Sequence, residues 1–141
     1  MSLDLSSIEK AWLQLDAVAE RSRDKVFMAA QDDITRNAIK SGVIQHFEIV
    51  YELCWKFMQR WIRENRSPEE ADHARTRKDL FRIAAQCGLI HDPMPWFAYA
   101  EARNLSVHTY NQKEADAVYT IVESFTRDAY YLLERLREKN D

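Results

Sequence analysis

The sequence predicts an all-α fold: an up-and-down bundle of four to five helices that forms one domain over residues 1–141. The chain has only 2 glycines and 3 prolines, whereas sheet proteins need many turns, which depend on those residues. Apolar residues recur at intervals of three and four, as on the buried face of a helix. The length of 141 residues suits a single core, and no repeat or long linker divides the chain.

The first predicted helix runs from Ser6 to about Arg23. Ser6 and Glu9 have the spacing of a capping box, in which each side chain satisfies a backbone N–H at the start of a helix. The residues from Lys25 to Asp33 have a mixed character that predicts no clear element.

The second predicted helix is the longest and runs from Ile34 to Glu64, with Asp32 or Asp33 as its cap. Its one weak point is Gly42, and a single glycine costs only about 1 kcal/mol relative to alanine. We therefore expect one continuous helix of roughly 45 Å, with a kink near Gly42 as the alternative.

Further start and stop signals divide the rest of the chain. Ser67-Pro68-Glu69-Glu70 predicts a short exposed turn of helix or a loop. An apolar stripe over Leu80–Cys87 predicts the next helix, which Gly88 ends in a left-handed conformation. Asp92-Pro93 opens another helix, and Asn111 caps the last one, which ends in a charged tail.

Composition excludes several classes of function. The formal net charge of −3 and the pI near 5.8 exclude a protein that holds nucleic acid by bulk positive charge, so any such contact is local. The sequence contains no glycine-rich phosphate loop and no paired Cys/His cluster, so we predict no metal and no cofactor. Cys54 and Cys87 lie in apolar segments, which favours buried thiols. We find no signal peptide and no apolar run of about 18 residues, so we expect a cytoplasmic protein.

The candidate site lies between the last two predicted helices, where Arg103, Asn104, His108 and Tyr110 occur within eight positions. Arginine offers a fixed charge that matches phosphate oxygens. Histidine ionises near neutral pH and can therefore donate or accept a proton. Together they suffice for attack of a ribose 2′-hydroxyl on its own phosphodiester without a metal. From these residues alone, a polar corner between helices is an equally good interpretation.

Helix geometry limits how these residues can meet. Positions five apart on a helix differ by about 140° in direction, so Arg103 and His108 do not converge if one helix carries both. A break in the backbone between Ser106 and Tyr110 could bring His108 toward Arg103. Alternatively, two copies of the motif could meet across a two-fold axis.

The run Arg103-Asn104-x-x-x-His108-x-Tyr110 resembles the Arg-x4-His-x-Tyr motif of the HEPN superfamily (higher eukaryote and prokaryote nucleotide-binding). It is most similar to small prokaryotic proteins known as nucleotidyltransferase substrate-binding proteins, some of which are toxins of toxin–antitoxin pairs. The likeness extends upstream to the segment Gln45–Lys56, which is similar to an acidic, aromatic helix of the family, and spans roughly residues 5–138.

The resemblance implies a bundle that forms a homodimer with its two motifs facing each other. It implies Arg103 and His108 as a metal-independent ribonuclease pair, Asn104 as a polar support and Tyr110 as the residue that a partner nucleotidyltransferase adenylylates. Glu48 and Glu52 lie one turn apart and could face the site, although a solvated or dimer-spanning ion pair is the simpler interpretation.

Three interpretations follow from the resemblance. The first is an endoribonuclease toxin that acts on RNA and has a minimal nucleotidyltransferase as its partner. The second is a non-enzymatic subunit that binds a nucleotide or substrate for such a nucleotidyltransferase. The third, a helical dimer that serves only as a scaffold, leaves the polar junction without a role.

Overall fold

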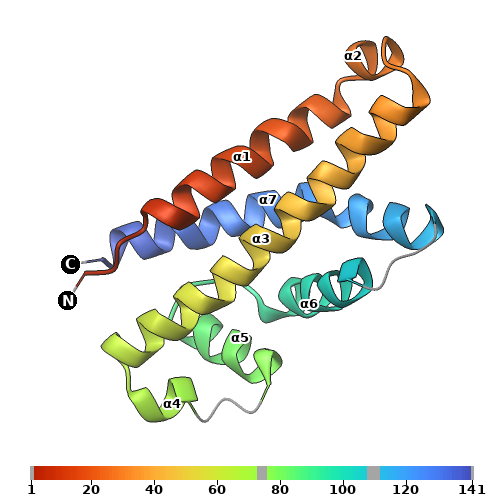
Figure 1. Ribbon diagram of the computed structural model, residues 1–141. Coiled ribbons are helices and arrows are strands. Elements are labelled where there is room, and N and C mark those ends of the chain that lie inside the picture. The colour runs from red at the N-terminus through yellow and green to blue at the C-terminus, as the bar shows by residue number, and fades with distance from the viewer. Residues whose placement is uncertain (1, 73–75, 108–111, 141) are drawn as a thin grey trace.

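The computed structural model shows an all-helical fold, as the sequence predicts (Figure 1). The structure describes residues 2–72, 76–107 and 112–140, and within these ranges it contains seven helices and no strand. The helices are α1 (Ser6–Arg23), α2 (Lys25–Ala29), α3 (Asp33–Asn65), α4 (Pro68–Asp72), α5 (Arg77–Gln86), α6 (Pro93–Val107) and α7 (Gln112–Glu138).

Three long helices form the body of the bundle, and two shorter ones complete it. Helices α1 and α3 run side by side in opposite directions, and α7 packs against both (Figure 1). Helices α5 and α6 pack on each other and on α3, and α6 also packs on α7. This arrangement brings the last turns of α6, which carry Arg103, next to the middle of α3.

Among the start signals that fall on described residues, three are confirmed and one is wrong, while the predicted cap at Asn111 lies outside the described residues. Asp32 caps α3 by accepting from Thr35 N at 2.7 Å, and Ser67 Oγ accepts from Glu70 N at 3.0 Å at the start of α4. Asp92 accepts from Met94 N at 3.0 Å where α6 begins. The predicted capping box at Ser6 is absent, because Asp4 accepts from both the backbone and the hydroxyl of Ser6.

Two glycines behave as the sequence predicts. Helix α3 continues through Gly42 without interruption. Gly88 has a φ of 77°, a left-handed conformation that glycine adopts without strain. Gly88 N donates to Ala85 O and Leu89 N donates to Ala84 O, the pair of hydrogen bonds that closes a helix in a Schellman motif. The chain can therefore turn sharply from α5 into α6.

Helices α2 and α4 are both short. No pattern in the sequence predicts α2. Asp24 accepts from Phe27 N at 3.0 Å and so caps α2 within the segment of mixed character. This helix buries only Met28, so it lacks the repeated apolar stripe on which a prediction from pattern depends.

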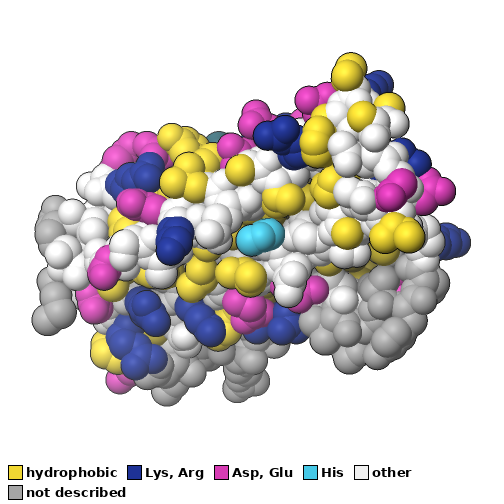
Figure 2. Space-filling view, turned by 45° about the horizontal axis from the view of Figure 1, so that its top comes forward, with side chains coloured by type: hydrophobic (Ala, Val, Ile, Leu, Met, Phe, Trp, Pro, Cys, Tyr) yellow, Lys and Arg dark blue, Asp and Glu magenta, His cyan; other side chains and the backbone are white. Residues whose placement is uncertain are grey.

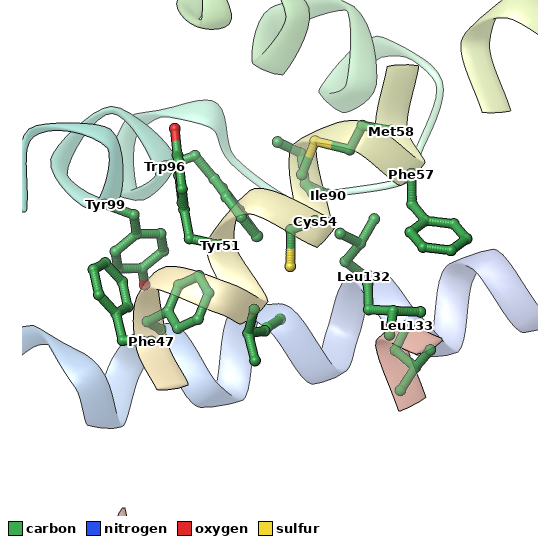
Figure 3. Packing of buried hydrophobic residues seen from close by; sticks show 14 of the residues in the cluster. Phe47, Tyr51, Cys54, Phe57, Met58, Ile90, Trp96, Tyr99, Leu132 and Leu133 are labelled. Atoms are coloured by element: carbon green, nitrogen blue, oxygen red, sulfur yellow. The ribbon is translucent and has the colours of Figure 1, made fainter. Parts of the chain in front are cut away.

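Aromatic side chains dominate the core where α3, α5, α6 and α7 meet (Figure 3). Phe47 meets Phe125 edge to face at 4.9 Å between ring centroids, and Phe81 packs against both Tyr51 and Trp96. All five side chains are at most 1% exposed. Burial of each contributes about 1.5–3 kcal/mol, so this cluster fixes how the four helices sit around the candidate site.

Of the two cysteines expected to be buried, Cys54 is buried and Cys87 is only partly buried. Trp96 is fully buried, whereas Trp12, Trp55 and Trp61 are partly buried against the core. Cys54 and Cys87 are free thiols, and burial raises the pKa of both. Within the described ranges, no helix is long and apolar enough to cross a membrane.

The two ends of the described chain are joined by one side chain. Asn140 Oδ1 accepts from Leu3 N at 2.7 Å, and Asn140 Nδ2 donates to Leu3 O at 2.9 Å. Figure 1 shows both ends on the same side of the molecule, where α7 finishes and α1 begins.

Candidate functional site

The candidate site centres on an ion pair between α6 and α3. Arg103 Nε lies 3.0 Å from Glu52 Oε1, and the two side chains are 31% and 25% exposed. The Nε–H is buried but makes no hydrogen bond in this geometry, so the contact is electrostatic. Because Arg103 lies 51 positions after Glu52 in the sequence, only the packing of α6 on α3 brings them together.

A second arginine binds the same carboxylate from α5. Arg77 Nη1 donates to Glu52 Oε1 at 3.2 Å, and Arg77 Nη2 donates to Oε2 at 3.4 Å. The Arg77 guanidinium also lies over the ring of Trp55 at 4.6 Å and over that of Tyr51 at 5.4 Å. Trp55 in turn donates from Nε1 to Glu52 Oε2 at 2.9 Å. Thus three elements of the fold hold one carboxylate between two guanidinium groups.

These neighbours set the ionisation of the site. Burial alone would raise the pKa of Glu52, but the hydrogen bond from Trp55 and the charges of Arg77 and Arg103 outweigh it and lower the pKa below its ordinary value. Burial raises the pKa of Tyr51, and the nearby Arg77 opposes that rise. The Tyr51 hydroxyl is buried and lacks a hydrogen bond of good geometry in the described chain; it points away from α7 (Figure 3). The site is therefore charged at neutral pH.

A cavity of about 440 Å³ opens beside the arginines. Its wall contains Arg77 and Lys78 from the start of α5 and Arg103 and Asn104 from the end of α6, together with Thr76 and Ala100. Glu52 is not part of the wall and lies behind the two arginines. The wall carries three positive side chains and no acidic one, in a chain whose formal net charge is −3.

The remaining residues singled out in the sequence are placed differently. Asn104 is exposed on the cavity wall, next to Arg103. Glu48 is half-buried one turn before Glu52 and forms no ion pair with the described residues. His108 and Tyr110 belong to residues 108–111, which lie outside the described part of the chain.

Sequence reasoning missed Arg77 and Lys78. The signal was present, since Arg75-Thr76-Arg77-Lys78 concentrates three basic residues directly after a polar connection. Thr76 caps α5 by accepting from Asp79 N at 3.2 Å, and the two residues that follow it line the cavity. A basic run of this kind is usually a solvated surface, so its role is visible only once the fold places it beside Arg103.

The arrangement suits the binding of an anion. Two guanidinium groups share one carboxylate, so one positive charge of the trio is left uncompensated, and the exposed Lys78 adds another. Guanidinium groups match the oxygens of phosphate as well as those of carboxylate. Within the described ranges, no group of three or more His, Cys, Asp or Glu residues could hold a metal ion.

An all-helical bundle with an arginine-lined cavity at one corner is the class of protein that the fold and site define. A family model described as nucleotidyltransferase substrate binding protein like matches residues 3–138. The chain belongs to this family, which confirms the resemblance found in the sequence.

Individual relatives agree with this assignment. The chain is 35% identical over 138 residues to a protein of Haemophilus influenzae named probable ribonuclease HepT, covering 98% of this chain and 94% of that protein. A solved structure from Haemophilus influenzae, described as the fold of a substrate binding domain of a nucleotidyltransferase, superposes with a TM-score of 0.89. It is 34% identical, and the match covers 95% of this chain and 99% of that one.

A second solved structure, from Thermus thermophilus, is 28% identical and superposes with a TM-score of 0.71. The match covers 92% of this chain and 98% of the other. The helical arrangement is thus shared over nearly the full length of both known structures.

Proposed function

We propose that this protein is a metal-independent endoribonuclease that cleaves RNA with Arg103 and His108. The observation that carries the proposal is the position of Arg103, which lies half-buried on the wall of a positively charged cavity, although the chain as a whole is acidic. This arginine opens the Arg-x4-His pattern, and a relative 35% identical to the chain is named a probable ribonuclease.

The proposed reaction needs one proton carrier and one fixed positive charge. The ribose 2′-oxygen attacks the neighbouring phosphorus while the bond from phosphorus to the 5′-oxygen breaks. A proton leaves the 2′-hydroxyl and a proton is added to the departing 5′-oxygen, and His108 serves in these transfers. Arg103 stabilises the negative charge that grows on the phosphate oxygens. The products are a 2′,3′-cyclic phosphate and a 5′-hydroxyl.

The test is cleavage of RNA by the purified protein in the presence of EDTA. We expect products with 2′,3′-cyclic phosphate ends, and we expect Arg103→Ala and His108→Ala each to reduce the rate by about 10²–10³-fold or more. Arg127→Ala is the matched control, because Arg127 is an exposed arginine of α7 that pairs only with Glu123 among the described residues. Equal activity of all three variants, or no cleavage by the parent protein, would contradict the proposal.

A second candidate function is a non-enzymatic subunit that binds a nucleotide or substrate for a nucleotidyltransferase. The structural match with a TM-score of 0.89 to a protein described as a substrate binding domain favours it. The same cavity would then hold the phosphates of a nucleotide. Nucleotide binding that depends on Arg103, without any RNA cleavage, would select this function over the first.

We further propose that the protein works as a homodimer in the cytoplasm, with a minimal nucleotidyltransferase as its partner in a toxin–antitoxin pair. The family name supports the partner, and Leu105, an apolar residue of α6 that is 43% exposed, supports a subunit contact near the motif. Tyr110 is the proposed acceptor of AMP. Incubation with the partner and ATP is expected to add AMP to the parent protein but not to Tyr110→Phe, as intact-mass spectrometry would show. Addition to both proteins would exclude Tyr110.

A further inference from the structure

The cavity beside Arg103 has a second basic wall that the proposed reaction does not use. Arg77 and Lys78 line it from the first turn of α5, facing Arg103 and Asn104 of α6. A volume of about 440 Å³ falls in the ordinary range of small-ligand pockets, about 300–1,000 Å³. The space is therefore large enough for part of a nucleotide and not only for a single ion.

Charge decides which kind of ligand fits this wall. Lys78, Arg77 and Arg103 are all positive, and Thr76 and Asn104 add neutral polar groups. Figure 2 shows one face of the molecule, on which acidic, basic and apolar side chains are interspersed. A local concentration of positive charge within a concave surface attracts anions, and phosphate is the anion that several arginines and lysines bind together.

The arginines are held in place before any ligand arrives. Glu52 contacts both guanidinium groups from the side of α3, and the rings of Trp55 and Tyr51 lie beneath Arg77. Side chains that are already ordered lose less conformational freedom on binding, which raises affinity. Since Glu52 stands behind the arginines and outside the cavity wall, a ligand can approach them from the open side.

We infer that Arg77 and Lys78 form a subsite for a backbone phosphate of RNA, adjacent to the phosphate that Arg103 contacts. The inference rests on the proposed ribonuclease function, because it assigns the neighbouring nucleotide of the same substrate. Arg77 and Lys78 bind and position the chain, whereas the bond-breaking step stays with Arg103 and His108. Recognition of phosphate alone carries no information on base sequence.

Binding of a short, fluorescently labelled 2′-O-methyl oligoribonucleotide in EDTA tests the subsite. The blocked 2′-oxygens prevent cleavage, so anisotropy reports binding alone. We expect Arg77→Gln to weaken binding about tenfold and to reduce the slope of log K against log salt by about 0.7, the share of one phosphate contact on a single strand. Lys78→Gln is expected to change the slope in the same direction.

Two further variants separate phosphate binding from a structural role of Arg77. Arg82→Gln removes the same charge from the same helix, outside the cavity wall, where Arg82 pairs with Asp79; we expect a change below about twofold. Arg77→Lys keeps the charge and is expected to restore the salt dependence. An Arg77→Gln protein that melts like the parent and binds RNA no more weakly than Arg82→Gln would overturn the subsite.

Failure of the subsite is distinguishable from failure of the ribonuclease proposal. If the parent protein cleaves RNA but Arg77→Gln retains the parent's KM, the subsite is wrong and the proposed function stands. If the parent neither cleaves nor binds RNA, the proposed function is wrong, and calorimetry with inorganic tripolyphosphate then decides the subsite. Binding that is lost in Arg77→Gln supports an anion subsite, and absence of binding overturns it.

Discussion

Two carboxylates lie against the same face of α6, and their surroundings differ. Tyr99 and Arg103 are four positions apart, so their side chains point the same way from the helix. Tyr99 donates its hydroxyl proton to Asp128 of α7 and also contacts Ser124 at 3.4 Å. Arg103, one turn later, meets Glu52 of α3. Asp128 thus has an uncharged partner from α6, whereas Glu52 has two charged ones, Arg77 and Arg103.

The cavity that Asp128 lines and the cavity beside Arg103 also differ in the charge of their walls. The one that Asp128 lines has a volume of about 190 Å³, and its wall includes Asp92 and no lysine or arginine. The one beside Arg103 has about 440 Å³ and three basic residues. The hydroxyl of Tyr99 stabilises Asp128 without neutralising it, so the cavity that Asp128 lines keeps a negative charge. Two arginines outnumber the single carboxylate of Glu52, so the cavity beside Arg103 keeps a positive charge that can attract an anion from outside the protein. The sign of the remaining charge therefore distinguishes the candidate site from the corner at Asp128.

Among the tests of this comparison, removal of the Tyr99 hydroxyl is expected to change the unfolding free energy most. Tyr99→Phe leaves Asp128 without its main donor in a partly buried place, so we expect unfolding free energy to fall by about 1–2 kcal/mol. RNA cleavage per folded molecule is expected to stay within about twofold, because no charge near Arg103 changes. Urea denaturation and the cleavage assay measure the two quantities. A strong loss of cleavage in the folded variant would show that the two corners do not act separately.

A smaller change in stability is expected when Glu52 is protonated at acid pH. Its pKa lies below the ordinary value of 4.5, so its contribution to stability is complete above that pH and declines as the pH falls through the lowered pKa. Glu52→Gln lacks this contribution. We expect the variant to be less stable than the parent near neutral pH by up to about 1 kcal/mol, with the difference shrinking as the pH falls below 4.5.

Urea denaturation of both proteins across this pH range provides the measurement. Glu64→Gln is the matched control, because Glu64 is an exposed glutamate of the same helix without an ion pair to the described residues. A stability difference at Glu52 that grows toward acid pH would contradict the assigned direction of the pKa.

The fold could be predicted from local patterns because its main signals are local. The cap at Asp32 and the left-handed Gly88 depend on residues within a few positions, and both appear in the structure. The error at Ser6 has a similarly local cause, since Asp4, two positions earlier, is a better acceptor for the same N–H. Helix α2 escaped prediction because it buries a single side chain.

The candidate site could be predicted only in part. The motif drew attention to Arg103, and the acidic face of α3 drew attention to Glu52. That these two meet, and that Arg77 joins them, depends on how α5 and α6 are turned about their axes when they pack on α3. Such rotations follow from the fit of Phe81 and Trp96 in the core, which no spacing in the sequence expresses.

The two hydrogen bonds between Leu3 and Asn140 have a practical consequence. Helix α7 has 27 residues and so extends about 40 Å. These hydrogen bonds lie at its C-terminal end, whereas the motif precedes its N-terminal end. An affinity tag or a surface attachment at either terminus would therefore emerge on one side of the protein, far from the arginines. Immobilised molecules would keep their cavities open to solution, and a short peptide joining the two ends would permit circularly permuted chains.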